Sequence, residues 1–129
     1  MHFILADALG AGLGRAFIGS FFVLAVITEA VVMLLFKLNS IAKVFLNSLI
    51  VNAVSLGIGY LALPVVSGMD SLLSPRGAIL RLAILFTLTV LVEGVLLIML
   101  NKKQHKNTVW LATVVMNLAS YLLLYLFFL

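Results

Sequence analysis

Cysteine is absent from this chain of 129 residues, and charged residues are scarce at 9% of the total. Without cysteine there is no disulfide, no thiol chemistry and no thiolate metal site. The two histidines, His2 and His105, lie far apart and make no metal-ligand pattern with a carboxylate. We therefore expect no metal and no cofactor. Soluble domains average about 25% charged residues, so this surface has too little charge for water.

Apolar residues take the place of the missing charge. They make up 65% of the chain, whereas soluble domains contain about 45–50%. A small fold buries only about two-thirds of the surface that its unfolded chain exposes. Most of the remainder must therefore face lipid, which excludes a soluble enzyme, a nucleic-acid-binding module and a disordered tail. The expected partner is the lipid bilayer, and no nucleic acid is expected.

Four apolar stretches reach the roughly 20 residues that a membrane-spanning helix needs. They run over about residues 16–36, 41–66, 79–100 and 109–129. Each must be helical, because lipid offers the backbone no hydrogen-bond partner. Short connections make neighbouring helices antiparallel, which predicts an all-α membrane protein with an up-down-up-down bundle of four transmembrane helices. Residues 1–15 are expected to form an interfacial segment, and residues 67–77 an outer loop.

The lysines indicate an orientation in the membrane. They all fall in or beside the first and third connections, residues 37–43 and 101–108, as Lys37, Lys43, Lys102, Lys103 and Lys106. Lysine and arginine favour cytoplasmic loops. We therefore expect both connections in the cytoplasm of a bacterial inner membrane, and both termini outside.

The two halves of the chain resemble each other. Residues 22–36 align with 86–100, and residues 44–63 with 109–128. The matched polar pairs are Glu29 with Glu93, Asn52 with Asn117, Ser55 with Ser120, and Tyr60 with Tyr125. These pairs carry the argument, because matched Leu and Val are commonplace in lipid. They predict two tandem helical hairpins, residues 16–66 and 78–129, as parallel repeats about a pseudo-two-fold axis along the membrane normal.

Ionisable residues inside a membrane span are the strongest functional signal here. Glu29 lies eight residues before Lys37, and Asn52 lies nine residues after Lys43, so both sit at about the same depth on antiparallel helices. Ser55 shares a helix face with Asn52. We expect one Glu–Asn–Ser cluster inside each hairpin, with at least one of the two glutamates protonated at neutral pH. The candidate residues are Glu29, Glu93, Asn52, Asn117, Ser55 and Ser120.

Three interpretations of these clusters stay open, and one of them is a lipid or small-molecule site. As polar clamps, their hydrogen bonds hold helices in register, which suits an accessory or scaffold subunit of a larger membrane complex, or a homo-oligomer. As titrating groups, Glu29 and Glu93 suit a proton- or cation-coupled small transporter or channel. An enzyme is not expected, because no histidine lies at the depth of the carboxyl groups to complete a nucleophile–base or metal site.

One short stretch resembles a known family. Glu29 followed by Lys37 is similar to the region around the first-helix glutamate of small multidrug resistance exporters. Those proteins lack this hairpin duplication, and the present chain has no counterpart to their glycine-rich third helix. No site residue is assigned from this resemblance.

Overall fold

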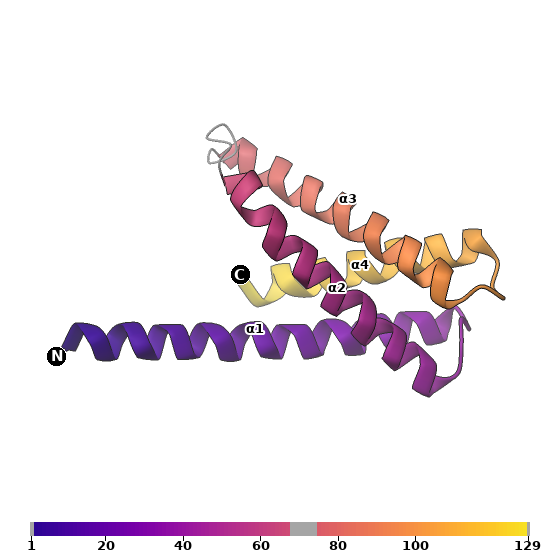
Figure 1. The fold of residues 1–129 in the computed structure, drawn as a ribbon, viewed down its shortest axis with the longest axis horizontal. Helices are drawn as coiled ribbons and strands as arrows, with labels where there is room; N and C mark the ends of the chain where they lie inside the picture. The colour runs from indigo at the N-terminus through magenta and orange to yellow at the C-terminus, as the bar shows by residue number, and fades with distance from the viewer. Residues whose placement is uncertain (1, 68–74, 129) are drawn as a thin grey trace.

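The computed structural model describes the backbone of residues 2–67 and 75–128, and side chains within 19–62, at 80, within 83–123 and at 125–126. These residues form four helices and no strand: α1 (His2–Leu35), α2 (Ile41–Ser67), α3 (Pro75–Leu100) and α4 (Lys106–Phe128) (Figure 1). The prediction of an all-α chain with four helices is confirmed.

The helices form a ring in which each packs against two others. Helix α1 contacts α2 and α4, and α3 contacts the same two helices. The diagonal pairs, α1 with α3 and α2 with α4, make no direct contact among the described residues. Successive helices alternate in direction, so the parallel helices α1 and α3 stand opposite each other across the bundle (Figure 1).

Helix α1 is longer than the predicted first span. It runs without a break from His2 through Gly10, Gly12 and Gly14 to Leu35, whereas a separate segment was expected over residues 1–15. Glycine in a helix costs about 1 kcal/mol relative to alanine, and here that cost does not interrupt the helix. The outer loop expected at residues 67–77 falls mostly on residues 68–74, which lie outside the described residues.

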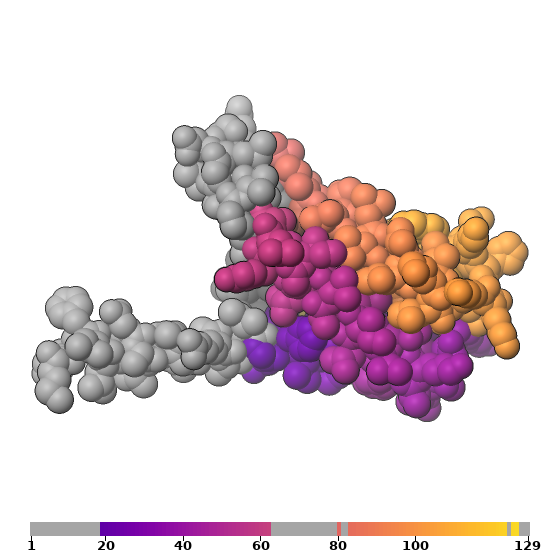
Figure 2. Space-filling model, in the orientation of Figure 1, coloured from indigo at the N-terminus to yellow at the C-terminus, as the bar shows by residue number. Residues whose placement is uncertain are grey.

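Buried side chains gather at one end of the bundle, beside the two lysine-bearing connections. The hydrophobic core consists of Ala30, Val32, Met33, Leu38, Val44, Val51, Leu97, Val109, Ala112 and Met116. Helices α2 and α3 lie side by side (Figure 2). Toward the connection between α2 and α3, those two helices diverge from α1 (Figure 1). The bundle is thus closed at the lysine end and spread at the other.

The end of α1 shows how the first connection stays short. The Leu38 N–H donates to the carbonyl of Met33 at 3.0 Å, and the Lys37 N–H donates to that of Leu34 at 2.9 Å. Lys37 takes a φ of 53°, so the helix ends in a Schellman motif with a left-handed residue. This turn directs Leu38 into the core and allows α2 to start at Ile41.

Polar side chains tie the two connections together. Asn101 is buried, and its Oδ1 accepts hydrogen bonds from Nδ2 of Asn39 at 3.0 Å and of Asn47 at 3.3 Å. In the opposite direction, Nε2 of Gln104 donates to the carbonyl of Leu38 at 2.8 Å. Each hairpin therefore holds the connection of the other, which closes the lysine end.

Within the described residues, two helical segments are long and apolar enough to cross a membrane, namely Ile41–Ala62 in α2 and Ala83–Leu100 in α3. The apolar part of α1 within the described residues, Gly19–Leu35, is shorter. Of the four predicted spans, length and composition therefore support the second and third. Core helices of soluble proteins can also pass this test, so the result is weak support for a membrane location.

Candidate functional site

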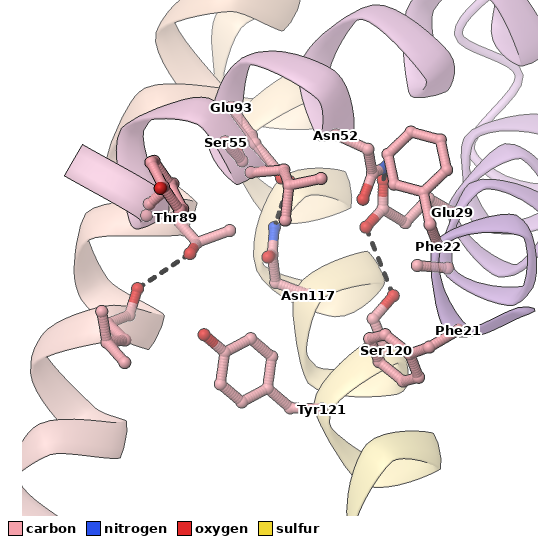
Figure 3. Close-up of a pocket in the computed structure, with 15 residues that line it drawn as sticks. Phe21, Phe22, Glu29, Asn52, Ser55, Thr89, Glu93, Asn117, Ser120 and Tyr121 are labelled. Atoms are coloured by element: carbon pink, nitrogen blue, oxygen red, sulfur yellow. Dashed lines mark hydrogen bonds between the residues drawn. The ribbon is translucent and has the colours of Figure 1, made fainter. Parts of the chain in front are cut away.

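A cavity of about 460 Å³ lies between the four helices, in the half of the bundle away from the lysines. Its lining is mostly apolar and aromatic, and it includes all six candidate residues predicted from the sequence (Figure 3). The lining residues are Phe21, Phe22, Ala25, Glu29, Asn52, Ser55, Leu56, Gly59, Tyr60, Leu85, Thr89, Glu93, Asn117, Ser120 and Tyr121. Residues from both hairpins therefore line the same cavity.

Glu29 of α1 is buried and is held through both carboxyl oxygens. Its Oε2 accepts a short hydrogen bond from Nδ2 of Asn52, and its Oε1 accepts one from Oγ of Ser120 at 3.3 Å. Oγ of Ser48 lies 3.3 Å from Oε2 and 3.0 Å from the carbonyl of Val26. A hydroxyl has one proton to donate, so Ser48 serves one of these acceptors at a time.

Glu93 of α3 is equally buried but has fewer partners. Its Oε2 accepts a hydrogen bond from Nδ2 of Asn117 at 2.8 Å. No described residue donates to its Oε1 in hydrogen-bond geometry. The Ser55 hydroxyl lies beside this carboxyl group (Figure 3), yet Ser55 Oγ is buried without a hydrogen-bond partner among the described residues. Proximity here does not amount to a hydrogen bond.

Each asparagine lies beside the glutamate of its own hairpin, as their equal depth in the predicted helices indicates. Asn52 bonds to Glu29 within the first hairpin, and Asn117 bonds to Glu93 within the second. Matched positions of the two halves therefore make matched hydrogen bonds.

The serines differ from the prediction of one complete cluster inside each hairpin. Ser120 of the second hairpin bonds to Glu29 of the first, while Ser55 of the first lies beside Glu93 of the second. Residues three apart differ by about 60° around a helix. A helix that directs its asparagine to one neighbour therefore directs its serine to the other. The clusters are shared between hairpins, and the correct pairing needed the packing of all four helices.

One further matched pair of hydroxyl-bearing residues was not predicted from the sequence. Ser48 and Thr113 precede the two asparagines by one helical turn, and both are buried. The Asn52 Nδ2 donates to the carbonyl of Ser48 at 3.0 Å, and the Asn117 Nδ2 donates to that of Thr113 at 3.0 Å. The spacing of four residues before each asparagine was the signal that could have identified them.

Aromatic rings form part of the cavity wall. The ring of Tyr121 meets that of Phe86 edge to face, with centroids 5.2 Å apart and planes at 88°. Thr89 lies on the same side of the cavity, and its hydroxyl donates to the carbonyl of Leu85 at 2.8 Å. This wall is apolar apart from the Tyr121 hydroxyl, so the carboxyl groups are the main polar feature.

Within the described part of the chain, the cavity is lined by two acidic side chains and no basic one. Among the described residues, no three His, Cys, Asp or Glu side chains lie together as a metal site would require. Carboxyl groups without a positive partner in an apolar space either hold a proton or take up a cation. The chemistry that the arrangement can perform is therefore reversible binding of protons or cations.

The fold and the site define a four-helix protein with a pair of carboxyl groups in a central cavity. No family model matches the chain, and neither a curated protein nor a solved structure matches it. Its function must therefore be argued from these residues alone.

Proposed function

We propose that the chain is an integral membrane protein in which all four helices cross the bilayer. The span-like segments of α2 and α3 support this. Large apolar side chains also point outward from every helix, as Leu35, Leu61, Met99 and Leu126 do, each at least 60% exposed. Contiguous apolar surface on this scale is rare on soluble monomers. The lysine-bearing connections, residues 37–43 and 101–108, then lie in the cytoplasm.

Within that setting, we propose a small transporter that couples a cation to protons through Glu29 and Glu93. The observation that carries the proposal is that both carboxyl groups enter one cavity from diagonally opposite helices. The core closes the cavity toward the lysines, while Tyr60 at its other end is 75% exposed. Access from one side at a time is what coupled transport requires.

Charge balance gives the mechanism. Two carboxylates without a counterion are unfavourable in a space of low polarity. A proton on one of them removes part of that cost, and a bound cation can take its place. When one monovalent cation enters and one proton leaves, the charge of the site is unchanged. Exchange of this kind needs no other residue to change its charge.

Reconstitution in liposomes tests the proposal. The double variant Glu29→Gln with Glu93→Gln keeps the shape of both side chains but removes their titration. We expect uptake of phenethylamine driven by a proton gradient to exceed that of protein-free liposomes with the native chain, and to equal it with the double variant. The control Lys103→Gln, at an exposed position in the second lysine-bearing connection, should transport normally. Undiminished uptake by the double variant would refute coupling through this pair.

An accessory or scaffold subunit is the second candidate. It is favoured by Glu29, whose two oxygens are both held by donors from other helices, as a clamp would be. Purification of the native protein in a mild detergent addresses this role. A scaffold should retain a membrane-protein partner or form a homo-oligomer, and a lone, partner-free particle would contradict it.

A further inference from the structure

The two carboxyl groups of the cavity are not equivalent, although the sequence repeat makes them appear so. Both oxygens of Glu29 accept hydrogen bonds, from Asn52 and Ser120. Only one oxygen of Glu93 does, from Asn117. Glu29 is therefore fixed between α1, α2 and α4, whereas Glu93 keeps Oε1 available at the cavity.

The matched serines differ in the same way. Ser120 Oγ donates to Glu29, but Ser55 Oγ has no hydrogen-bond partner among the described residues and is shielded from solvent. Buried hydroxyl groups without a protein partner are rare in proteins. Ser55 lies beside the Glu93 carboxyl group (Figure 3), so this hydroxyl and a carboxyl group with a single hydrogen-bond donor line the same part of the cavity.

The space in front of these oxygens has the size and lining for an organic molecule. About 460 Å³ lies within the range of small-molecule pockets and far exceeds the volume of a bare ion. Phe22, Leu85 and Tyr121 supply apolar and aromatic surface. A ligand suited to this cavity has an apolar body and one polar, positively charged end.

We propose that Glu93 Oε1 and Ser55 Oγ form a subsite for the N–H groups of a protonated amine. This inference rests on the proposed cation-binding function and names its ligand class. The ammonium group donates one hydrogen bond to the carboxylate of Glu93 and another to Ser55, and its apolar body contacts the aromatic wall. Glu29 remains the clamp between the helices. The subsite requires N–H donors, so it selects a primary amine over a quaternary ammonium ion of similar shape.

Binding to the full-length protein in detergent micelles tests this selectivity. The probes are phenethylamine and its N,N,N-trimethyl derivative, measured by equilibrium dialysis. We expect the native chain to bind the primary amine about tenfold or more tightly than the quaternary ion, the scale of one hydrogen bond to a charged group. Ser55→Ala should reduce that preference, because only the hydrogen bond to Glu93 remains, and Ser55→Thr, which keeps the hydroxyl, should retain it in full.

Matched variants separate the subsite from general damage to the fold. Ser120→Ala removes the equivalent hydroxyl from Glu29 and should lower affinity for the primary amine less than Ser55→Ala does. Thr87→Val removes an exposed α3 hydroxyl that bonds to its own helix, and it should leave affinity unchanged. If Ser55→Ala does not fold, Ser55→Cys, which keeps the shape of the side chain but replaces the hydroxyl with a weakly hydrogen-bonding thiol, and the native preference for the primary amine decide the matter.

The outcomes distinguish two kinds of failure. Equal affinity of the native chain for both probes, or equal losses in the two serine variants, would overturn the subsite while leaving cation binding intact. Failure of the native chain to bind either probe would overturn the subsite and count against the proposed function as well.

Discussion

Gly94 lies next to Glu93, and the absence of a side chain there allows a close contact. A Cβ atom at this position would lie 2.2 Å from Cζ3 of Trp110 and 2.7 Å from two further ring atoms. The indole ring of α4 therefore packs directly on the backbone of α3. This contact sets the distance between the helices beside the carboxyl group.

Gly94→Ala should lower the free energy of unfolding by about 1–3 kcal/mol, because the added methyl group overpacks the contact with Trp110. The matched control is Gly57→Ala, where nothing lies within 4 Å of the new Cβ. That change should be neutral or stabilising by up to about 1 kcal/mol. Thermal unfolding in detergent measures both. Equal shifts for the two variants would contradict the packing described.

Asn117 is the donor that Glu93 depends on, and this gives a second prediction for single residues. Asn117→Ala leaves the buried Glu93 without a donor among the described residues, whereas Asn52→Ala leaves Glu29 with Ser120. We expect the loss of stability to be larger for Asn117→Ala, at about 1–3 kcal/mol. Denaturation in mixed micelles would measure the difference, and a larger loss for Asn52→Ala would reverse the assignment of the two carboxyl groups.

At the level of the helices, the end of α1 imposes a conformation that suits glycine better than lysine. Lys37 has a φ of 53°, which is unfavourable for residues with a Cβ. Lys37→Gly should therefore raise the free energy of unfolding by about 1 kcal/mol. The same change at Lys43, inside α2, should lower it by about 1 kcal/mol. Opposite signs in thermal unfolding support the capping motif, and equal signs contradict it.

The helices themselves were largely predictable, because long apolar runs separated by short polar connections indicate where α2, α3 and α4 lie. The start of α1 was not, since the residues expected to form a separate interfacial segment, 1–15, are continuous with the helix. The depth of Glu29 and Asn52 followed from counting residues. The sharing of Ser120 across hairpins did not, because it depends on how the helices are rotated against each other.

Viewed whole, the molecule has one closed end, and its orientation in a membrane is open to a direct test. The chain lacks cysteine, so one introduced cysteine gives an unambiguous label. In a suspension of intact cells, the cysteine of the Lys103→Cys variant should react with a membrane-impermeant maleimide only after the cells are permeabilised. Ser71→Cys, in the predicted outer loop, should react without permeabilisation. Reversed accessibility would overturn the proposed topology, and labelling of both in intact cells would overturn membrane separation of the two ends.

The closed end also explains how a small bundle can hold a cavity. Asn101 and Gln104 fix the connections of the two hairpins to each other, and the core fills the space beneath them. The opposite half is then free to spread around Glu29 and Glu93. The sequence predicted the residues at this site, but the existence of an open space between them depends on how tightly four helices pack.

Proton release on ligand binding tests the central claim most directly. Purified protein in weakly buffered detergent solution is mixed with phenethylamine near neutral pH, and the released protons are counted with a pH indicator. We predict about one proton per bound amine from the native chain, and none from the Glu29→Gln, Glu93→Gln double variant. Binding without proton release, or release that persists in the double variant, would contradict a site in which a cation and a proton share the two carboxyl groups.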